Sequence, residues 1–172
     1  CVSRQRVWGV PLPIFINKRT NKILVDDQVF DNIAKIYEKE GSDCWFSDDP
    51  QKFLGKKYKA EDFEKLSDIV EVWFDSGSTH SFVLEKRKDL KWPASMYLEG
   101  SDQHRGWFHS SLLESCGTRD RAPFESILSH GFVVDGKGLK MSKSLGNVIA
   151  PEDILKKYGA DILRIWVASS NY

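Results

Sequence analysis

The sequence predicts an α/β fold with parallel strands, carrying a small α+β insertion. Two patterns lead to this prediction. In the second half of the chain, short apolar runs typical of buried strands alternate with segments whose apolar residues recur at helical spacing, which indicates a parallel sheet. Residues from about 17 to 67, by contrast, are charged and weakly patterned over much of their length, which indicates a separate insertion on the larger fold.

The first part of the chain predicts an extended segment, a hairpin and one helix. Segment 3–17 is interrupted by a glycine and prolines, and its apolar residues 12–16 predict a strand. The polar stretch NKRTNK predicts a turn, and residues 23–25 predict the return strand of the hairpin. Apolar residues at helical spacing from Val29 onward predict a helix that ends near Gly41.

The second part begins with a strand followed by a helix. The run ASMYLEG, 94–100, predicts a buried strand that leads into a loop. QHRGWFHSSLLESCG, 103–117, predicts a helix with Phe108, Leu112 and Cys116 on one face, and its final glycine as the C-terminal stop.

A strand, a turn and two helices follow. Segment 124–136 predicts a strand and then a tight turn at its final Asp-Gly pair. Pro151 followed by acidic residues is typical of a helix start. Gly159 interrupts that helix, and residues 160–169 predict a second one.

Composition limits the class of protein. Acidic and basic residues both number 25, so any contact with nucleic acid must be local. The 3 cysteines are scattered and form no C-x-x-C pair, so we expect no zinc site in this segment and a reducing, cytoplasmic location. No apolar run approaches the roughly 20 residues that cross a bilayer, and we expect no membrane partner. The opening CVSRQRVWG lacks an initiator methionine, so we expect a piece of a longer protein.

A cationic loop stands out near the C-terminus. GKGLKMSKSLGN, residues 136–147 and called the lysine loop below, gathers three lysines among three glycines and contains no acid. It does not match G-x-x-x-x-G-K-[ST] and is therefore not a P-loop. Its residues are compatible with a solvated mobile loop and with a clamp for a polyphosphate.

Polar residues cluster where the predicted strand 94–100 ends. Glu99, Asp102 and Gln103 surround Gly100, and ligands of open α/β sheets bind beyond such strand ends. The glycine permits close approach of a ligand, and the acids can accept from ribose hydroxyls or an ammonium group. The alternative is a polar connection in which Asp102 is the N-cap of the next helix.

The remaining candidates are aromatic. His130 has the chemistry to stack on or hydrogen-bond to a nucleotide, although a lone histidine is more often structural. Trp8, Trp73 and Trp107 are candidates for core residues or for the walls of an apolar ligand pocket.

Read together, these segments resemble a known family. Lys140-Met141-Ser142-Lys143-Ser144, with His130-Gly131 upstream and Gly146-Asn147 downstream, resembles the second signature of class I aminoacyl-tRNA synthetases. SRQRVWGVPLP resembles the segment that re-enters the catalytic domain after the editing insertion of isoleucyl, valyl and leucyl enzymes. VWFDSGSTH and YLEGSDQHRGWF are similar to the versions found in bacterial isoleucyl-tRNA synthetases. Four matching segments occur in the family's order.

The resemblance implies a Rossmann-like catalytic half-domain of the class I synthetase type. Residues 1–16 would be the re-entry segment, 17–67 a small connective insertion, and 68–172 the C-terminal half of the catalytic domain with the KMSKS loop. The first signature, H-x-G-H, is absent from the sequence, as are an editing domain, anticodon-binding helices and a C-terminal zinc site. We therefore expect the segment alone to be inactive.

The implied activity is that of an isoleucine–tRNA ligase. Such an enzyme activates isoleucine with ATP and Mg²⁺ to isoleucyl-adenylate and transfers it to tRNA(Ile), so the implied partners are isoleucine, ATP, tRNA(Ile) and the remainder of the synthetase chain. The alternatives are a valyl or leucyl enzyme, or a non-catalytic synthetase-like module that binds nucleotide or RNA.

The family's site roles carry over to matching positions. Glu99, Gly100 and Asp102 would hold the aminoacyl-adenylate and its ribose. Trp73, Gln103 and Trp107 would line the amino-acid pocket, and His130 would lie beside the adenine. The catalytic residues would be Lys140 and Lys143, which bind the phosphates. Met141, Ser142 and Ser144 would complete the nucleotide-binding loop.

Overall fold

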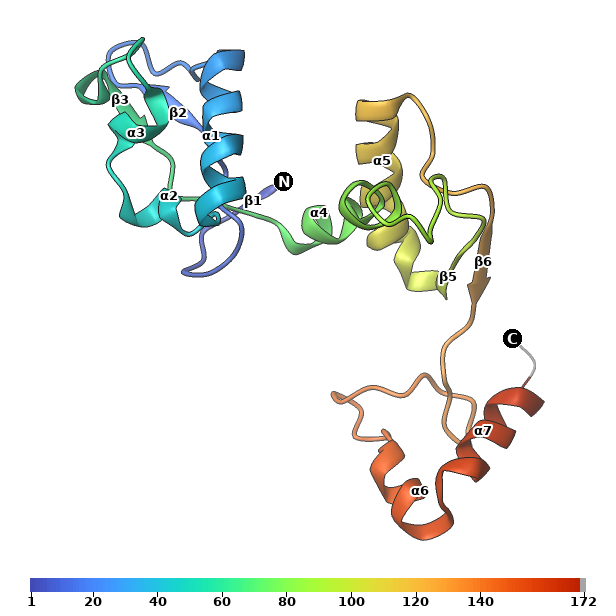
Figure 1. The fold of residues 1–172 in the computed structure, drawn as a ribbon. Helices are drawn as coiled ribbons and strands as arrows, with labels where there is room; N and C mark the ends of the chain where they lie inside the picture. Colours follow the sequence, from blue (N-terminus) through green and yellow to red (C-terminus); the bar gives the residue numbers. More distant parts are fainter. Residues whose placement is uncertain (171–172) are drawn as a thin grey trace. The chain divides into compact units, whose positions relative to one another are not determined.

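The computed structural model describes residues 1–170 and divides the chain into two compact units, one of residues 1–79 and one that begins at His80 (Figure 1). Each unit is described by itself. The expected boundaries of the insertion, 17 and 67, stay a prediction. The last two residues of the predicted half-domain 68–172 lie outside the described residues.

Short antiparallel pairs organise the first unit. Strand β1 (Ser3–Arg4) pairs with β4 (Ile69–Val70), and β2 (Phe15–Asn17) pairs with β3 (Phe63–Lys65). The predicted return strand at 23–25 is reduced to one antiparallel bridge, between Ile16 and Ile23. The regular partner of β2 comes instead from β3, more than forty residues further along the chain.

The predicted helix near Val29 is confirmed. Helix α1 spans Asp27–Glu40 and buries Val29 and Ile33. The Asp26 side chain accepts from the Gln28 amide at 2.9 Å, so the helix begins slightly before the apolar pattern does. It ends at Gly41, whose φ of 83° is readily adopted only by glycine.

The charged stretch after Gly41 folds around an aromatic core. It forms α2 (Cys44–Ser47), α3 (Pro50–Leu54) and η1 (Ala60–Asp62), followed after β3 and β4 by α4 (Val72–Gly77). The Trp45 ring is fully buried, with centroids 5.1 Å from Phe15 and 5.0 Å from Phe53. Its indole N–H donates to the Leu66 carbonyl at 2.7 Å, which satisfies the polar atom that burial would otherwise leave unpaired.

The second unit contains the predicted parallel pair. It opens with η2, a π-helical turn at His80–Leu84. Strand β5 (Tyr97–Gly100), the 3₁₀ turn η3 (Ser101–Arg105) and helix α5 (Trp107–Arg119) lead to β6 (Ile127–His130). Strands β5 and β6 are parallel, so the strand–helix–strand prediction is confirmed for this pair. All the other strand pairs of residues 1–170 are antiparallel.

The three residues predicted to share one face of α5 differ in burial. Leu112 and Cys116 are exposed, and the helix buries Phe108, Ser111 and Ser115. Ser111 Oγ donates to the Trp107 carbonyl at 2.7 Å, and Ser115 Oγ donates to the Arg121 carbonyl at 2.7 Å. Because these hydroxyls are satisfied locally, small polar residues can face inward.

The predicted stop of α5 at Gly117 is wrong. The helix continues through Gly117 to Arg119 and ends at Asp120, which adopts the left-handed conformation with φ 54°. The residue that ends a helix in this conformation is more often glycine, but aspartate also tolerates it. Gly117 was therefore a misleading signal for the end of the helix.

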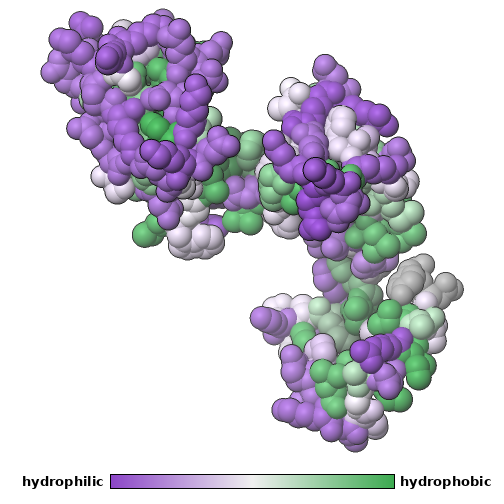
Figure 2. Space-filling model, in the orientation of Figure 1, coloured by the Kyte–Doolittle hydropathy of each residue, from purple (hydrophilic) through white to green (hydrophobic). Residues whose placement is uncertain are grey.

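The C-terminal segment contains the predicted turn and both predicted helices. Val134 and Lys140 form an antiparallel bridge around the turn, and the Asp135 amide donates to the Leu139 carbonyl at 2.8 Å. Helices α6 (Pro151–Tyr158) and α7 (Ala160–Ser169) follow, separated by Gly159. The apolar side chains of α7 are largely exposed, and Figure 2 shows hydrophobic surface over this segment. None of the helices described within residues 1–170 is long and apolar enough to cross a membrane.

Candidate nucleotide site and lysine loop

The carboxyl ends of β5 and β6 meet at one edge of the parallel pair. The register places Gly100 opposite His130 and Glu99 opposite Ser129. Parallel α/β sheets bind ligands at this edge. The structure therefore brings together two segments that the sequence singled out separately, and we call Glu99, Gly100, Asp102 and His130 the strand-end site.

The Asp102 carboxylate lies close to Gly100. A Cβ added at Gly100 would lie 2.7 Å from Asp102 Oδ1 and 3.7 Å from the His130 ring. The backbone of Gly100, with φ −67°, is one that any residue adopts, so the backbone conformation does not require a glycine here. The strand end at Gly100 is therefore bordered by an acid and an imidazole.

Asp102 is not a helix N-cap. It lies within η3, and the residue at the start of α5 is Gly106, for which no side-chain cap is present. The alternative interpretation of Asp102 as the cap of the following helix is therefore wrong. Its carboxylate is exposed at the strand end, where it is available to a ligand.

Glu99 and His130 complete the site. Glu99 is exposed, and its Oε2 accepts from the Gly100 amide at a long 3.4 Å. His130 Nδ1 lies 2.8 Å from the Gly131 carbonyl oxygen. When Nδ1 carries the proton and donates to this carbonyl, Nε2 is the acceptor nitrogen of the ring.

Gln103 and Trp107 are linked directly. Gln103 Oε1 accepts from the Trp107 amide at 2.9 Å. The Trp107 ring is stacked on Tyr97, with centroids 4.1 Å apart and planes at 8°. Sequence reasoning missed Tyr97, although an aromatic residue at the start of a buried strand was a signal for such packing.

Trp73 belongs to the first unit. It lies in α4, is 44% exposed, and its amide donates to Glu71 Oε2 at 2.7 Å. Trp8 is 65% exposed, so neither of these tryptophans is a core residue of that unit. That Trp73 lines a pocket with Gln103 and Trp107 stays a prediction.

The lysines of the loop are not held by acids. Within residues 1–170, none of Lys137, Lys140 and Lys143 forms a salt bridge. Lys140 Nζ lies 3.4 Å from the centroid of the Phe132 ring, a cation–π contact. Phe132 was missed by sequence reasoning, although its place two residues after His130 put it near the site.

Asp135 and Asn147 hold the two ends of the lysine loop together. Asp135 accepts from the amides of Lys137 at 2.8 Å and Leu139 at 3.0 Å, and from Asn147 Nδ2 at 2.9 Å. Asn147 Oδ1 accepts from the Ser142 amide at 2.9 Å. The hydrogen bond from Asn147, followed by those from the two amides, holds the pKa of Asp135 below its ordinary value.

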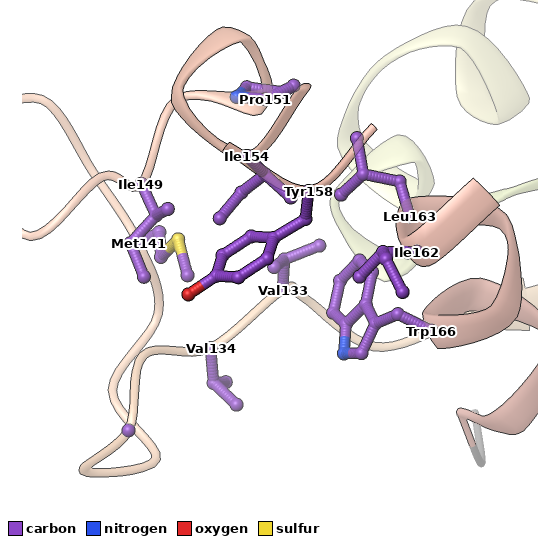
Figure 3. Close-up of a pocket in the computed structure, with 11 residues that line it drawn as sticks. Val133, Val134, Met141, Ile149, Pro151, Ile154, Tyr158, Ile162, Leu163 and Trp166 are labelled. Atoms are coloured by element: carbon purple, nitrogen blue, oxygen red, sulfur yellow. The ribbon is translucent and has the colours of Figure 1, made fainter. Parts of the chain in front are cut away.

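Other residues of the loop line a pocket or support its turn. Met141 lines a pocket of about 600 Å³ together with side chains from α6 and α7. Figure 3 shows the Tyr158 side chain of α6 reaching towards Met141. Ser142 Oγ lies 3.2 Å from Ser144 Oγ and accepts from the Leu145 amide at 3.3 Å. Both serines therefore support the local turn in this conformation.

The second unit contains an acidic strand end and, six residues after the end of β6, a cationic loop. The acids suit hydroxyl and ammonium donors, and the lysines suit phosphate oxygens. In the described part of the chain, no group of three or more His, Cys, Asp or Glu side chains is placed to hold a metal ion. The chemistry favoured by these residues is recognition of a nucleotide together with an amine.

The fold is compatible with that of a class I tRNA synthetase. Residues 1–172 match the family described as tRNA synthetases class I (I, L, M and V), and the chain belongs to this family. The family that the sequence motifs predicted is therefore confirmed.

Two similar individual proteins are both isoleucine–tRNA ligases. The chain is 88% identical to isoleucine–tRNA ligase of Pelagibacter ubique over 172 residues, which are all of this chain and 19% of that protein. It is 58% identical over 177 aligned positions to isoleucine–tRNA ligase of Caldicellulosiruptor saccharolyticus, again covering 100% of the chain and 19% of the relative. The chain thus spans about a fifth of the length of these curated relatives.

A solved structure supports the fold. The LeuRS of Agrobacterium radiobacter K84, in a ternary complex with tRNA and LeuAMS, matches 96% of this chain and 24% of its own, with a TM-score of 0.63 and 23% identity. At this identity the match supports the class I synthetase fold and not a particular substrate.

Proposed function

We propose that this chain is the part of an isoleucine–tRNA ligase that binds the adenylate and carries the KMSKS loop, within a Rossmann-like catalytic domain. The complete enzyme activates isoleucine with ATP and transfers it to tRNA(Ile) in the cytoplasm. The observation that carries the proposal is the meeting of Gly100, Asp102 and His130 at one strand end. The lysine loop begins six residues after His130 in the sequence. The names of the two relatives support isoleucine over leucine and valine.

The strand-end site would hold the nucleoside side of the adenylate. Gly100 has no side chain, which would let a ligand approach the backbone closely beside the Asp102 carboxylate. Glu99 and Asp102 would supply carboxylates for ribose hydroxyls or the amino group. His130, opposite Gly100, would border the adenine. Such contacts would place the α-phosphate near the amino-acid carboxylate, and positioning of this kind can supply much of the rate enhancement.

The lysine loop would act on the phosphates. Attack of the isoleucine carboxylate on the α-phosphorus forms the adenylate and expels pyrophosphate, so negative charge grows on the leaving group. Lys140 and Lys143 form no salt bridge within the described part of the chain and are available to stabilise that charge. Mg²⁺ would accompany ATP as its counterion; we assign no protein ligand to it.

Gln103 and Trp107, with Trp73, would border the isoleucine side chain. The hydrogen bond from the Trp107 amide to Gln103 and the stack on Tyr97 fix two of these groups relative to each other. A fixed apolar wall suits a branched aliphatic side chain. A rigid wall also excludes larger side chains more strongly than smaller ones.

Binding of isoleucyl-sulfamoyl-adenosine to the full-length protein tests the site by calorimetry. We expect Asp102→Asn to weaken binding by about tenfold or more, because a charge-assisted hydrogen bond is lost. Asp120→Asn, at the exposed end of α5, is the matched control. Equal binding by wild type and Asp102→Asn would refute the site, and no binding by wild type would favour a non-catalytic module.

A further inference from the structure

The base of the lysine loop is closed by two side chains that no part of the proposed chemistry uses. Asp135 stands just before the loop and Asn147 is its last residue. Their side chains are joined by the hydrogen bond from Asn147 Nδ2 to Asp135 Oδ2, 2.9 Å long. Each also holds backbone within the loop, through the amides of Lys137, Leu139 and Ser142.

These contacts surround the two lysines in sequence. Asn147 Nδ2 lies 3.3 Å from the Lys140 carbonyl, and Asn147 Oδ1 accepts from the amide of Ser142, which directly precedes Lys143. Asn147 is half-buried, so water competes less for its hydrogen bonds than it would at a fully exposed position. The backbone of the segment 140–142 is therefore tied to the Asp135–Asn147 pair.

The lysine side chains themselves are held more weakly. Lys140 rests on the Phe132 ring, and Lys143 is exposed. A cation–π contact at an exposed site is a weak interaction. The backbone at the base is thus the firm part of the loop, and the ammonium groups are the part that can follow charge.

We propose that Asp135 and Asn147 are positioning residues, which close the base of the lysine loop and thereby set the reach of Lys140 and Lys143 during adenylate formation. The proposal rests on the proposed function for its catalytic part. Its structural part, closure of the base of the loop, is independent of the proposed function. The two residues act through the loop backbone and do not touch substrate.

Three variants of the full-length protein test the pair. Asn147→Asp keeps the shape but sets two carboxylates against each other. Asp135→Asn removes the charge. The double exchange, Asp135→Asn with Asn147→Asp, restores one amide facing one carboxylate: the amide oxygen at 135 can accept from Lys137 and Leu139, and the carboxylate at 147 can accept from Ser142. Asn21→Asp makes the same chemical change at an exposed turn in the first unit.

The rate of trypsin cleavage after Lys140 and Lys143 measures whether the base of the lysine loop is closed, independently of enzymatic activity. We expect Asn147→Asp to be cut there about ten- to a hundredfold faster than wild type, the factor that corresponds to losing a hydrogen bond to a charged group. The double exchange should return the rate to within about threefold of wild type, and Asn21→Asp should not change it. Equal cleavage of wild type and Asn147→Asp, or a double exchange as labile as Asn147→Asp, would overturn the closure.

The rate of single-turnover adenylate formation tests the catalytic part of the proposal, the positioning of Lys140 and Lys143. We expect Asn147→Asp to slow it by about ten- to a hundredfold with the KM for isoleucine unchanged, and the double exchange to recover most of the rate. A variant whose loop opens to trypsin but which activates isoleucine normally would overturn the positioning role. If wild type activates no amino acid, the proposed function fails and the catalytic part fails with it, while the trypsin comparison still decides the closure.

Discussion

The ring of Tyr97 lies parallel to the ring of Trp107, with centroids 4.1 Å apart and planes at 8°. Tyr97 is the first residue of β5 and is 4% exposed, whereas Trp107 begins α5 and is half-buried. The stack therefore connects the buried start of the strand to the helix that follows its far end. The stack also supports Trp107, which we propose as a wall of the isoleucine pocket.

Loss of the Tyr97 ring should destabilise the second unit. We expect Tyr97→Ala to lower the free energy of unfolding by about 3–5 kcal/mol, the usual cost of removing a buried aromatic ring. Tyr97→Phe keeps the stack and should cost about 1.5 kcal/mol or less. Urea unfolding followed by tryptophan fluorescence measures both. Similar stability of the Ala and Phe variants would contradict the structural role of the stack.

Gly100→Ala should separate binding from folding. The added methyl would lie 2.7 Å from the Asp102 carboxylate, which can rotate away, so we expect stability to change by about 1 kcal/mol or less. Binding of the adenylate analogue should weaken, because both the carboxylate and the space are disturbed. Gly117→Ala, where nothing lies within 4 Å of the added methyl, is the control and should leave binding unchanged. An unchanged affinity in Gly100→Ala would mean that the ligand lies elsewhere.

Acid should weaken the first unit through Asp26. Hydrogen bonds from Lys57 and then from Tyr58 lower the pKa of Asp26 from 3.8 to about 2. The ionised carboxylate therefore stabilises the folded state above about pH 4, and this contribution is lost as the pH falls from 3.8 towards 2. Asp26→Asn retains an acceptor for the Gln28 amide and removes the charge.

Thermal unfolding between about pH 2 and pH 6 measures this contribution. We expect Asp26→Asn to have a lower Tm than wild type at about pH 6, and the two curves to converge near pH 2. Asp27→Asn, one residue along at an exposed position, should follow wild type more closely. A constant difference between wild type and Asp26→Asn across the range would show that the ion pair is not its source.

Lys143 should act chiefly in the transition state. It is exposed and forms no salt bridge within the described residues, so it is not committed to a ground-state partner. Lys143→Ala should slow isoleucine activation by about a hundred- to a thousandfold, or roughly 3–4 kcal/mol, with the isoleucine KM nearly unchanged. Lys143→Arg should recover only part of the rate. Pre-steady-state adenylate formation measures this, and a near-normal rate in the Ala variant would make the loop a bystander.

Local signals in the sequence predicted much of the fold. Helix α1 lies between a capping aspartate and Gly41, and α6 between Pro151 and Gly159, so each end has a short-range cause. The parallel pairing of β5 with β6 followed from strand–helix–strand alternation. The meeting of Gly100 with His130 is a consequence of that pairing.

Tertiary contacts explain what the sequence did not reveal. The Trp45 core lies in a stretch whose charged residues mask its few aromatic ones, and it forms only when residues far apart pack together. The buried serines of α5 carry no hydrophobic signal. Phe132 beneath Lys140 and the Asp135–Asn147 pair depend on how the loop turns, which residue spacing does not determine.

Amino-acid-dependent exchange of pyrophosphate into ATP by the full-length protein tests the central claim most directly. We predict the highest kcat/KM with isoleucine, and measurable activity with valine, because a missing methylene costs only about 1–3 kcal/mol, a range for which isoleucyl enzymes are themselves the established example. The separately expressed 172-residue chain should show no exchange, because it lacks H-x-G-H. A full-length protein that prefers valine or leucine, or that supports no exchange with any amino acid, would contradict the account.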